Sequence, residues 1–161
     1  SSAASDVYKR QLYTWLGESS KFEGEWSNNQ EGYIDGPPEF LAKNDSTDVI
    51  SFDLQIKDGE VRGELRTDAR LKICETIEKR LKNFCTLIAS HPLMIEGKKS
   101  PFSNQFDAYI TEWREGEKRL IAILNMKIED DGEMVVTNTM RALESRTFPQ
   151  KFYMIKIIDA D

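Results

Sequence analysis

The chain has 161 residues and a mass of 18.6 kDa, which suits one domain with a single sizeable core. Its net charge of −6 and its pI near 5.0 argue against a nucleic-acid polymer as partner, because that affinity rests on Lys and Arg neutralising phosphates. The longest aliphatic run is Leu120–Leu124, far short of the ~20 apolar residues that a membrane-spanning helix needs.

Residues 1–11 (SSAASDVYKRQ) contain neither an initiator Met nor the apolar segment of a signal peptide. The piece SDVYKRQ is similar to the translated adapter sequence found at the ends of metagenomic gene models. We therefore expect residues 1–11 to be a disordered tag or gene-model scar. Residues 12–161 are then the single folded domain, which begins with a brief element at Leu12–Leu16.

The first expected strand is Phe22–Ser27. Phe22, Gly24 and Trp26 fall on one face of it, and the acidic residues between them fall on the other. The polar residues 28–47 that follow predict a long loop, which could be a lid over the domain or a plain surface excursion.

The strongest pattern lies in residues 48–66. Asp48–Lys57 alternates apolar and polar residues, Asp58-Gly59 is a two-residue hairpin signal, and Glu60–Arg66 alternates again. Ile50, Phe52, Leu54 and Ile56 form the inward face of the first strand. We expect a β-hairpin here.

The period then changes to that of a helix. Apolar residues recur at helical spacing from Leu71 to Phe84, after Asp68 as a possible N-cap, and predict one amphipathic helix over about 68–84. Its apolar stripe would flank the barrel or bury a dimer partner.

Cys74 and Cys85 on one such helix would lie about 16 Å apart along the axis, too far for an intramolecular disulfide. Reduced thiols and a cytoplasmic location are the expectation.

Strands resume after this helix, separated by the turn signals Glu115-Gly116 and Asp130-Asp131-Gly132. The expected strands are 87–96, with Pro92 at a bend or edge, 106–113, 119–128, 133–140 and 151–158. The count predicts a mainly β fold, an antiparallel up-and-down barrel of about eight strands with one inserted helix. Such a barrel is either filled by side chains or holds one small ligand.

The Gly24-Glu25-Trp26 motif in the first strand resembles the start of calycin barrels, the lipocalin-like and avidin-like group. The resemblance covers residues 21–158 and implies a Trp placed across one end of the barrel. Trp26 is then a core plug or a ligand contact. The chain departs from secreted lipocalins because its helix lies between early strands and it shows no signal peptide.

The strand Glu23-Gly24-Glu25-Trp26, the Asp58-Gly59 hairpin and the pair Phe148-Pro149 also resemble the receptor domain of membrane-tethered bacterial anti-phage effectors. This resemblance implies a barrel that senses a cyclic oligonucleotide. It also implies a membrane anchor in an upstream segment absent from this chain.

A phosphorylated ligand requires Arg or Lys for its phosphates and aromatic faces for its bases. Arg62 and Arg66 alternate with Glu60 and Glu64, so they bind such a ligand or form exposed cross-strand ion pairs. Tyr109 and Trp113 share a face with polar residues and point into a polar cavity or into solvent. The full set of candidate ligand-binding residues is Trp26, Arg62, Arg66, Tyr109, Trp113, Asn125, Arg141 and Tyr153.

Asn125 shares a face with Ile121 and Ile123, which makes it the candidate for a polar residue inside the barrel, bound to a ligand or to a structural partner. The chain has no catalytic motif, and His91 stands alone, so we expect no catalytic residues, no metal and no cofactor.

The expected function is non-catalytic binding of a small molecule, foremost a nucleotide second messenger in bacterial defence. An apolar-ligand carrier and a filled oligomerisation or adaptor module are the alternatives. The partners are thus a small ligand such as a cyclic nucleotide, no nucleic-acid polymer, and a second copy if the domain oligomerises.

Overall fold

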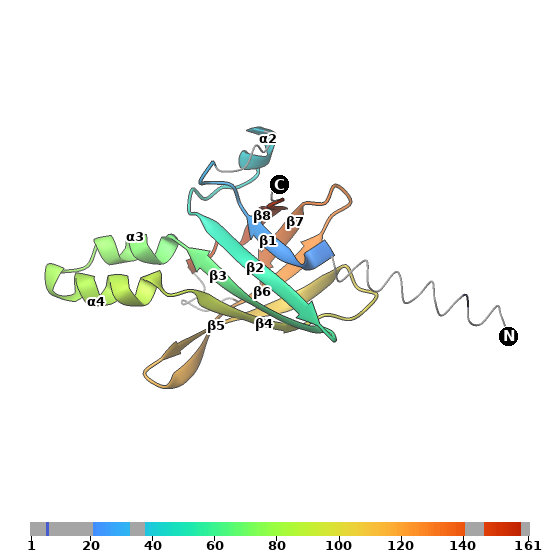
Figure 1. Ribbon diagram of the computed structural model, residues 1–161. Helices are drawn as coiled ribbons and strands as arrows, with labels where there is room; N and C mark the ends of the chain where they lie inside the picture. Colours follow the sequence, from blue (N-terminus) through green and yellow to red (C-terminus); the bar gives the residue numbers. More distant parts are fainter. Residues whose placement is uncertain (1–5, 7–20, 33–37, 141–146, 159–161) are drawn as a thin grey trace.

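The computed structural model describes residue 6 and residues 21–32, 38–140 and 147–158. Its strands follow one another around a closed barrel in the order of the sequence, and the last strand pairs with the first (Figure 1). Every pairing is antiparallel. The predicted fold class, a mainly β, eight-stranded up-and-down barrel with a helical insertion, is confirmed.

The strands are β1 (Gly24–Ser27), β2 (Ile50–Lys57), β3 (Glu60–Thr67), β4 (Leu93–Lys98), β5 (Gln105–Arg114), β6 (Glu117–Ile128), β7 (Met134–Asn138) and β8 (Lys151–Lys156). The helices in the described part of the chain are α2 (Pro38–Leu41), α3 (Ala69–Glu75) and α4 (Lys79–Ser90). None of these helices is long and apolar enough to cross a lipid bilayer.

Two tight turns set the register of their hairpins. Asp58 and Gly59 have φ values of 53° and 79°, and Glu115 and Gly116 have φ values of 54° and 80°. Positive φ at both central residues is the conformation whose twist matches the flanking strands, and Gly adopts it without a steric cost. These two predicted hairpins, β2–β3 and β5–β6, are confirmed, as is the third, β6–β7, at Asp130-Asp131-Gly132.

The inside of the barrel is filled by apolar side chains. Each strand contributes its inward face, and the side chains in this core are at most 5% exposed. A ligand-sized hollow would leave its lining accessible to water, so the described residues enclose a packed interior. The core consists of Phe22, Trp26, Ile50, Phe52, Leu54, Val61, Leu65, Leu93, Ile95, Phe106, Ala108, Ile110, Ala122, Leu124, Met126, Met134, Val136, Phe148, Phe152 and Met154.

We call the two ends of the barrel the plug end and the hairpin end. At the plug end, the ring of Phe22 packs edge-on against Phe106, with 5.2 Å between ring centroids. The indole N–H of Trp26 donates to the carbonyl of Phe22 over 2.9 Å, which satisfies the buried donor of the Trp. The hairpin end is the opposite end of the barrel, where β3 leads into α3 and α4 leads into β4; it is named after the pair of helices inserted there.

The helical insertion consists of two helices rather than one. The chain leaves α3 at Thr76, whose hydroxyl donates to the carbonyl of Ile73, and re-enters a helix at Lys79. The two helices form an antiparallel pair, which we call the helical hairpin (residues 69–90), and it projects from the barrel (Figure 1).

Cys74 and Cys85 form a disulfide between α3 and α4, with a Cα–Cα distance of 5.6 Å. The prediction of unpaired, reduced thiols is wrong because it placed both cysteines on one continuous helix. The break at residues 76–78 folds α4 back along α3 and brings the two side chains together. Since such disulfides are typical of oxidising compartments, they lend no support to the predicted cytoplasmic location.

The strand predicted for residues 87–96 is shorter. Residues 87–90 form the last turn of α4, and β4 begins at Leu93, directly after Pro92. Leu87 and Ile88 continue the helical spacing of apolar residues, which explains why the helix runs on.

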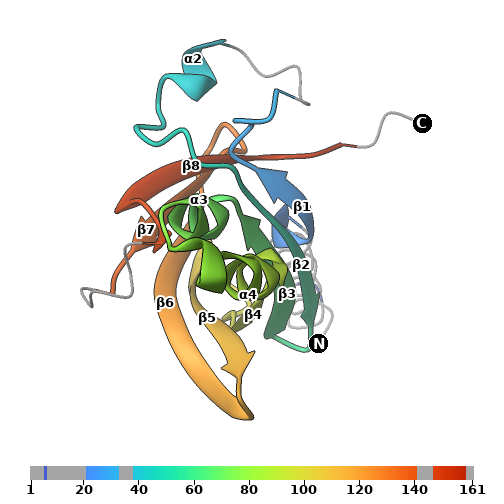
Figure 2. The same cartoon turned by 90° about the vertical axis from the view of Figure 1, so that its left-hand side faces the viewer.

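The β5–β6 hairpin extends beyond the barrel. The register shifts at Ile110 and Thr111, and residues 112–119 pair only across this hairpin, because β4 and β7 pair with β5 and β6 elsewhere. We call residues 112–119 the arm. Figure 2 shows it bending away from the barrel below α4.

Replacing Gly63 with Ala should destabilise the barrel by about 3 kcal/mol, because the new Cβ would overlap the backbone carbonyl of Asp53 on β2. Gly116→Ala is the control, since nothing lies near its Cβ position and only its positive φ of 80° is strained, at about 1 kcal/mol. Urea unfolding of both variants measures the difference. Equal losses would contradict the close packing of β2 on β3.

Replacing both Cys74 and Cys85 with Ser should destabilise the helical hairpin by up to about 3 kcal/mol, because the disulfide closes a short loop in the unfolded chain. Amide hydrogen exchange should show faster exchange in α3 and α4 and unchanged exchange in β2 and β3. Loss of protection throughout the barrel would contradict this local effect.

Candidate functional site

A cleft of about 270 Å³ lies where the helical hairpin leaves the barrel. Its walls come from the start of β2, the end of β3, α3, and the junction between α4 and β4. The polar residues lining it are Glu31, Ser51, Arg66, Thr67, Asp68, Arg70, Ser90 and His91, and the apolar ones are Val49, Leu65, Leu71, Ala89 and Leu93.

Arg66 and His91 supply N–H donors to this cleft. Arg66 lies on the outer face of β3, in register with Ser51 of β2. Neither its guanidinium nor the imidazole of His91 has a hydrogen-bond or ion-pair partner among the described residues. An Arg without a carboxylate partner can give its paired N–H groups to an anion.

The acidic groups of the cleft differ in how they are engaged. Asp68 accepts a hydrogen bond from the backbone N–H of Val49 over 2.7 Å, and its second oxygen lies 3.5 Å from Lys72. Partial withdrawal from water raises the pKa of Glu31; a hydrogen bond with Ser27 opposes this shift, and the charge of Asp68 adds to it. The raised pKa means that Glu31 binds a proton at a higher pH than a freely solvated glutamate does.

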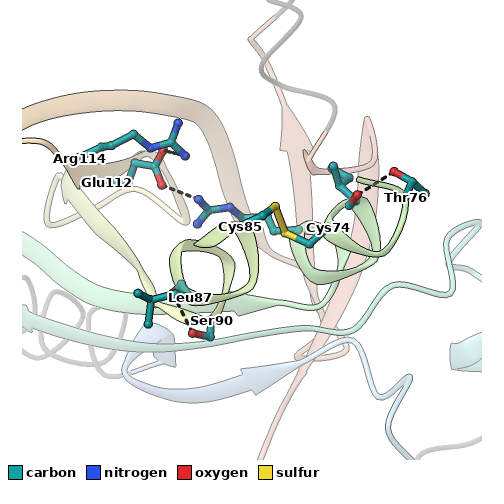
Figure 3. Close-up of a disulfide and its surroundings, with 9 residues drawn as sticks. Cys74, Thr76, Cys85, Leu87, Ser90, Glu112 and Arg114 are labelled. Carbon is teal, nitrogen blue, oxygen red and sulfur yellow. Dashed lines mark hydrogen bonds and ion pairs between the residues drawn. A yellow bond between two sulfur atoms is a disulfide. The ribbon is translucent and has the colours of Figure 1, made fainter. Parts of the chain in front are cut away.

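Arg70 is bound to the arm. Its guanidinium lies 2.6 Å from one oxygen of Glu112, and Arg114 lies 3.4 Å from the other oxygen. The Arg70 and Glu112 side chains are only 13% and 10% exposed. Figure 3 shows Glu112 and Arg114 beside the helical hairpin that carries the disulfide. This ion pair fastens α3 to the arm and leaves Arg66 as the uncommitted Arg of the cleft.

A second cleft of about 320 Å³ adjoins the first, because Glu31, Ser51 and Arg66 line both. It runs over the outer faces of β1, β2 and β3, where Glu25, Asp53 and Glu64 make it acidic. Together the two clefts form a groove with Arg66 at its centre.

The largest of the described clefts, about 670 Å³, lies at the plug end. Trp26 and Lys156 border it together with the acidic β6–β7 turn, residues 129–133. Trp26 is only 1% exposed, and the ammonium of Lys156 lies 5.9 Å from the centre of its ring. This geometry places Trp26 in the core as a plug.

Arg62 and Tyr109 lie in one row across the outside of the sheet. Arg62 on β3 is in register with Glu96 on β4, and Glu96 is in register with Tyr109 on β5. Arg62 pairs with Glu96 over 3.2 Å, and Lys118 pairs with the same carboxylate over 2.6 Å. Arg62 thus forms the exposed cross-strand ion pair that was one of its two interpretations.

Asn125 does not lie inside the barrel. The inward residues of β6 are Ala122, Leu124 and Met126, and Asn125 on the outer face donates to Asp107 of β5 over 3.1 Å. The prediction took Ile121 and Ile123 as markers of the core. Both faces of β6 carry apolar residues, so alternation alone could not identify the inner one.

The remaining candidates are dispersed. Trp113 lies on the arm and is 67% exposed. Tyr153 is half-buried on β8, where its ring lies 5.5 Å from the ammonium of Lys43 and its backbone N–H donates to Asn44. Arg141 lies outside the described residues. Of the predicted set, the structure places Arg66 in the cleft at the hairpin end.

Sequence reasoning missed the contributions of Glu31, Arg70, Ser90 and His91 to the cleft. These residues come from three separate segments that only the closed barrel and the helical hairpin bring together. A usable signal was the position of His91 and Pro92, directly between a helix and a strand, where side chains line the junction.

Comparisons with known proteins place this chain in no family. No protein-family model matches the sequence, and no curated protein matches it. Among solved structures, a mutant of the fluorescent protein UnaG is similar, with 14% sequence identity and a TM-score of 0.39; the match covers 87% of this chain and 99% of that one.

Replacing Glu112 with Gln should destabilise the protein by about 3 kcal/mol, because it leaves Arg70 in a largely buried position without a counter-charge. Adding Arg70→Met should restore part of the loss. The exposed pair of Arg62 and Glu96 provides the control, since Arg62→Ala should cost less than about 1 kcal/mol. Equal effects of Glu112→Gln and Arg62→Ala in denaturant unfolding would show that the Arg70 pair is not buried in solution.

Proposed function

We propose that this protein binds a small phosphorylated ligand of the nucleotide second-messenger class at the hairpin end, without catalysing a reaction on it. The observation that carries the proposal is that Arg66 and His91, both without partners in the described part of the chain, line the same cleft as the hydroxyls of Ser51 and Ser90.

The chemistry of this cleft suits a phosphate with an attached apolar or aromatic group. The Arg66 guanidinium can donate two parallel hydrogen bonds to phosphate oxygens, and His91 can donate a further one. Val49 and Leu71 line the same cleft, are partly exposed, and offer an apolar surface for a base. The carboxylate of Glu31, when it is charged, repels the phosphate of such a ligand.

The size of the groove limits the ligand. Small-molecule pockets commonly measure about 300–1,000 Å³. The first cleft, of about 270 Å³, lies just below this range and limits a nucleotide ligand to about the size of a mononucleotide. A cyclic dinucleotide or oligonucleotide would also have to enter the adjoining cleft of about 320 Å³, where Glu25, Asp53 and Glu64 repel a second phosphate, so the geometry favours a ligand with one phosphate. A role in bacterial anti-phage defence rests on the sequence resemblance alone and stays a prediction.

The packed interior weighs against the carrier alternative, which requires an apolar cavity inside the barrel. The described residues leave no such space, because their inward side chains are almost inaccessible. The adaptor alternative is compatible with a filled barrel, and ligand binding is what distinguishes it from the sensor.

The test is a thermal-shift screen against cyclic AMP, cyclic GMP, cyclic dinucleotides and cyclic trinucleotides, with a long-chain fatty acid as the carrier probe. A ligand at 100 times its Kd stabilises the folded state by about 2.7 kcal/mol, which such a screen detects. Arg66→Ala should weaken binding at least about tenfold, since it removes charge-assisted hydrogen bonds.

Arg62→Ala is the matched control. It lies four residues earlier on the same face of β3, already pairs with Glu96, and lies outside the cleft, so it should leave the affinity unchanged. Glu31→Gln should tighten binding, because it removes a negative charge from the cleft. The proposal fails if no nucleotide shifts the melting temperature, or if Arg66→Ala and Arg62→Ala weaken binding equally.

A further inference from the structure

The outward side of α4 is an exposed apolar stripe. Leu81, Phe84 and Leu87 are 58%, 61% and 59% exposed. They lie three residues apart, so each is rotated by about 60° from the last and the three follow one side of the helix. Exposed side chains of this size in a continuous row indicate a surface that contacts an apolar phase or partner.

The stripe cannot turn inward. On the neighbouring face of α4, about 120° around the axis from the middle of the stripe, Cys85 is bonded to Cys74 of α3, and Ala89 is buried. These contacts fix the rotation of α4 about its own axis. Leu81, Phe84 and Leu87 therefore face away from the barrel because of how α4 is attached.

Basic residues cluster at the start of α4; Arg80 lies on the same side as the stripe, and Lys79 and Lys82 lie on the opposite, polar face. Lys79, Arg80 and Lys82, in the first turn of α4, are exposed, and none has an ion-pair partner among the described residues. Cations at the first turn of a helix are disfavoured by the helix dipole, so helix stability does not explain them. Residues 69–91 carry five basic and two acidic side chains, a formal net charge of +3 on a chain of net charge −6, and of these basic residues Arg70 and Lys72 are paired with Glu112 and Asp48 from outside the segment.

We infer that the helical hairpin docks onto an anionic lipid surface. Leu81, Phe84 and Leu87 insert into the boundary between headgroups and acyl chains, and Lys79, Arg80 and Lys82 lie among the anionic headgroups. An apolar stripe on a helix whose polar face is basic is the pattern of helices that lie in a membrane interface. A nucleic acid would meet the basic residues but offers no apolar phase for Phe84.

The shape of the molecule fits this orientation. The helical hairpin and the arm project from the same side of the barrel (Figures 1 and 2), so both can reach one flat surface. The arm carries Trp113, 67% exposed, and Trp is favoured at membrane interfaces. The rest of the chain has a net charge of −9, which an anionic surface repels, so the helical hairpin is the part of the molecule that faces the surface.

This contact lies within the present chain and differs from an anchor in an upstream segment.

The test is co-sedimentation with vesicles of phosphatidylcholine alone and with vesicles of equal parts phosphatidylcholine and phosphatidylglycerol. The protein should bind the anionic vesicles and dissociate as salt is raised, because the headgroup attraction is screened. Phe84→Ser should reduce binding about tenfold through the lost apolar burial. Lys79→Glu with Lys82→Glu should reduce it at least about tenfold.

Each variant has a matched control at the plug end of the barrel. Phe102→Ser changes a Phe of similar exposure, 63%, in the connection between β4 and β5. Lys57→Glu with Lys98→Glu changes the net charge by the same amount on exposed strand ends. Both controls should bind like the unchanged protein, and melting curves of all variants show that each is folded.

The inference is overturned if anionic vesicles do not retain the protein, or if Phe84→Ser and Phe102→Ser reduce binding equally. Sedimentation velocity without lipid provides the other decisive outcome. A dimer that Phe84→Ser converts to a monomer, without any vesicle binding, would assign the stripe to a second copy of this chain.

Discussion

Closure of the barrel depends on a short seam. β1 has four residues, and it pairs with β2 on one side and, through Trp26 and Ser27, with β8 on the other. So short a ladder contributes little by itself. The buried rings of Phe22 and Trp26, and the hydrogen bond between them, hold β1 in place from the inside. Because a closed sheet exposes no unpaired edge, this plug makes the rest of the architecture possible.

Because the same packing fills the interior of the barrel, the proposed binding surfaces lie on the outside of the molecule. A barrel of eight strands has a narrow interior, and here large apolar side chains occupy it. The proposed binding therefore depends on what is attached to the barrel. The helical hairpin, fastened by the disulfide and by the ion pair between Arg70 and Glu112, forms one wall of the cleft at the hairpin end. It also exposes the apolar stripe of α4, so one insertion contributes both to the cleft and to the proposed lipid-binding surface.

Local patterns predicted most of the fold. The hairpins at Asp58-Gly59 and Glu115-Gly116, the inward face of β2 and the eight-stranded meander all follow from turn chemistry and two-residue alternation, which act within a few residues. The helical segment was also predictable, but not its break at Thr76, because the apolar spacing continues across it. The disulfide was missed for the same reason.

The candidate site was less predictable. Arg66 was identified from its residue type, whereas Arg62, four residues earlier on the same strand, is neutralised by Glu96 from β4. Asn125 was misplaced because both faces of β6 are apolar, and its register with β5 decides which face is inside. Strand order, turns and the helical insertion are encoded by neighbours along the chain. The inner face of β6, the disulfide and the cleft around Arg66 arise from pairs distant in sequence, which meet only when the barrel closes.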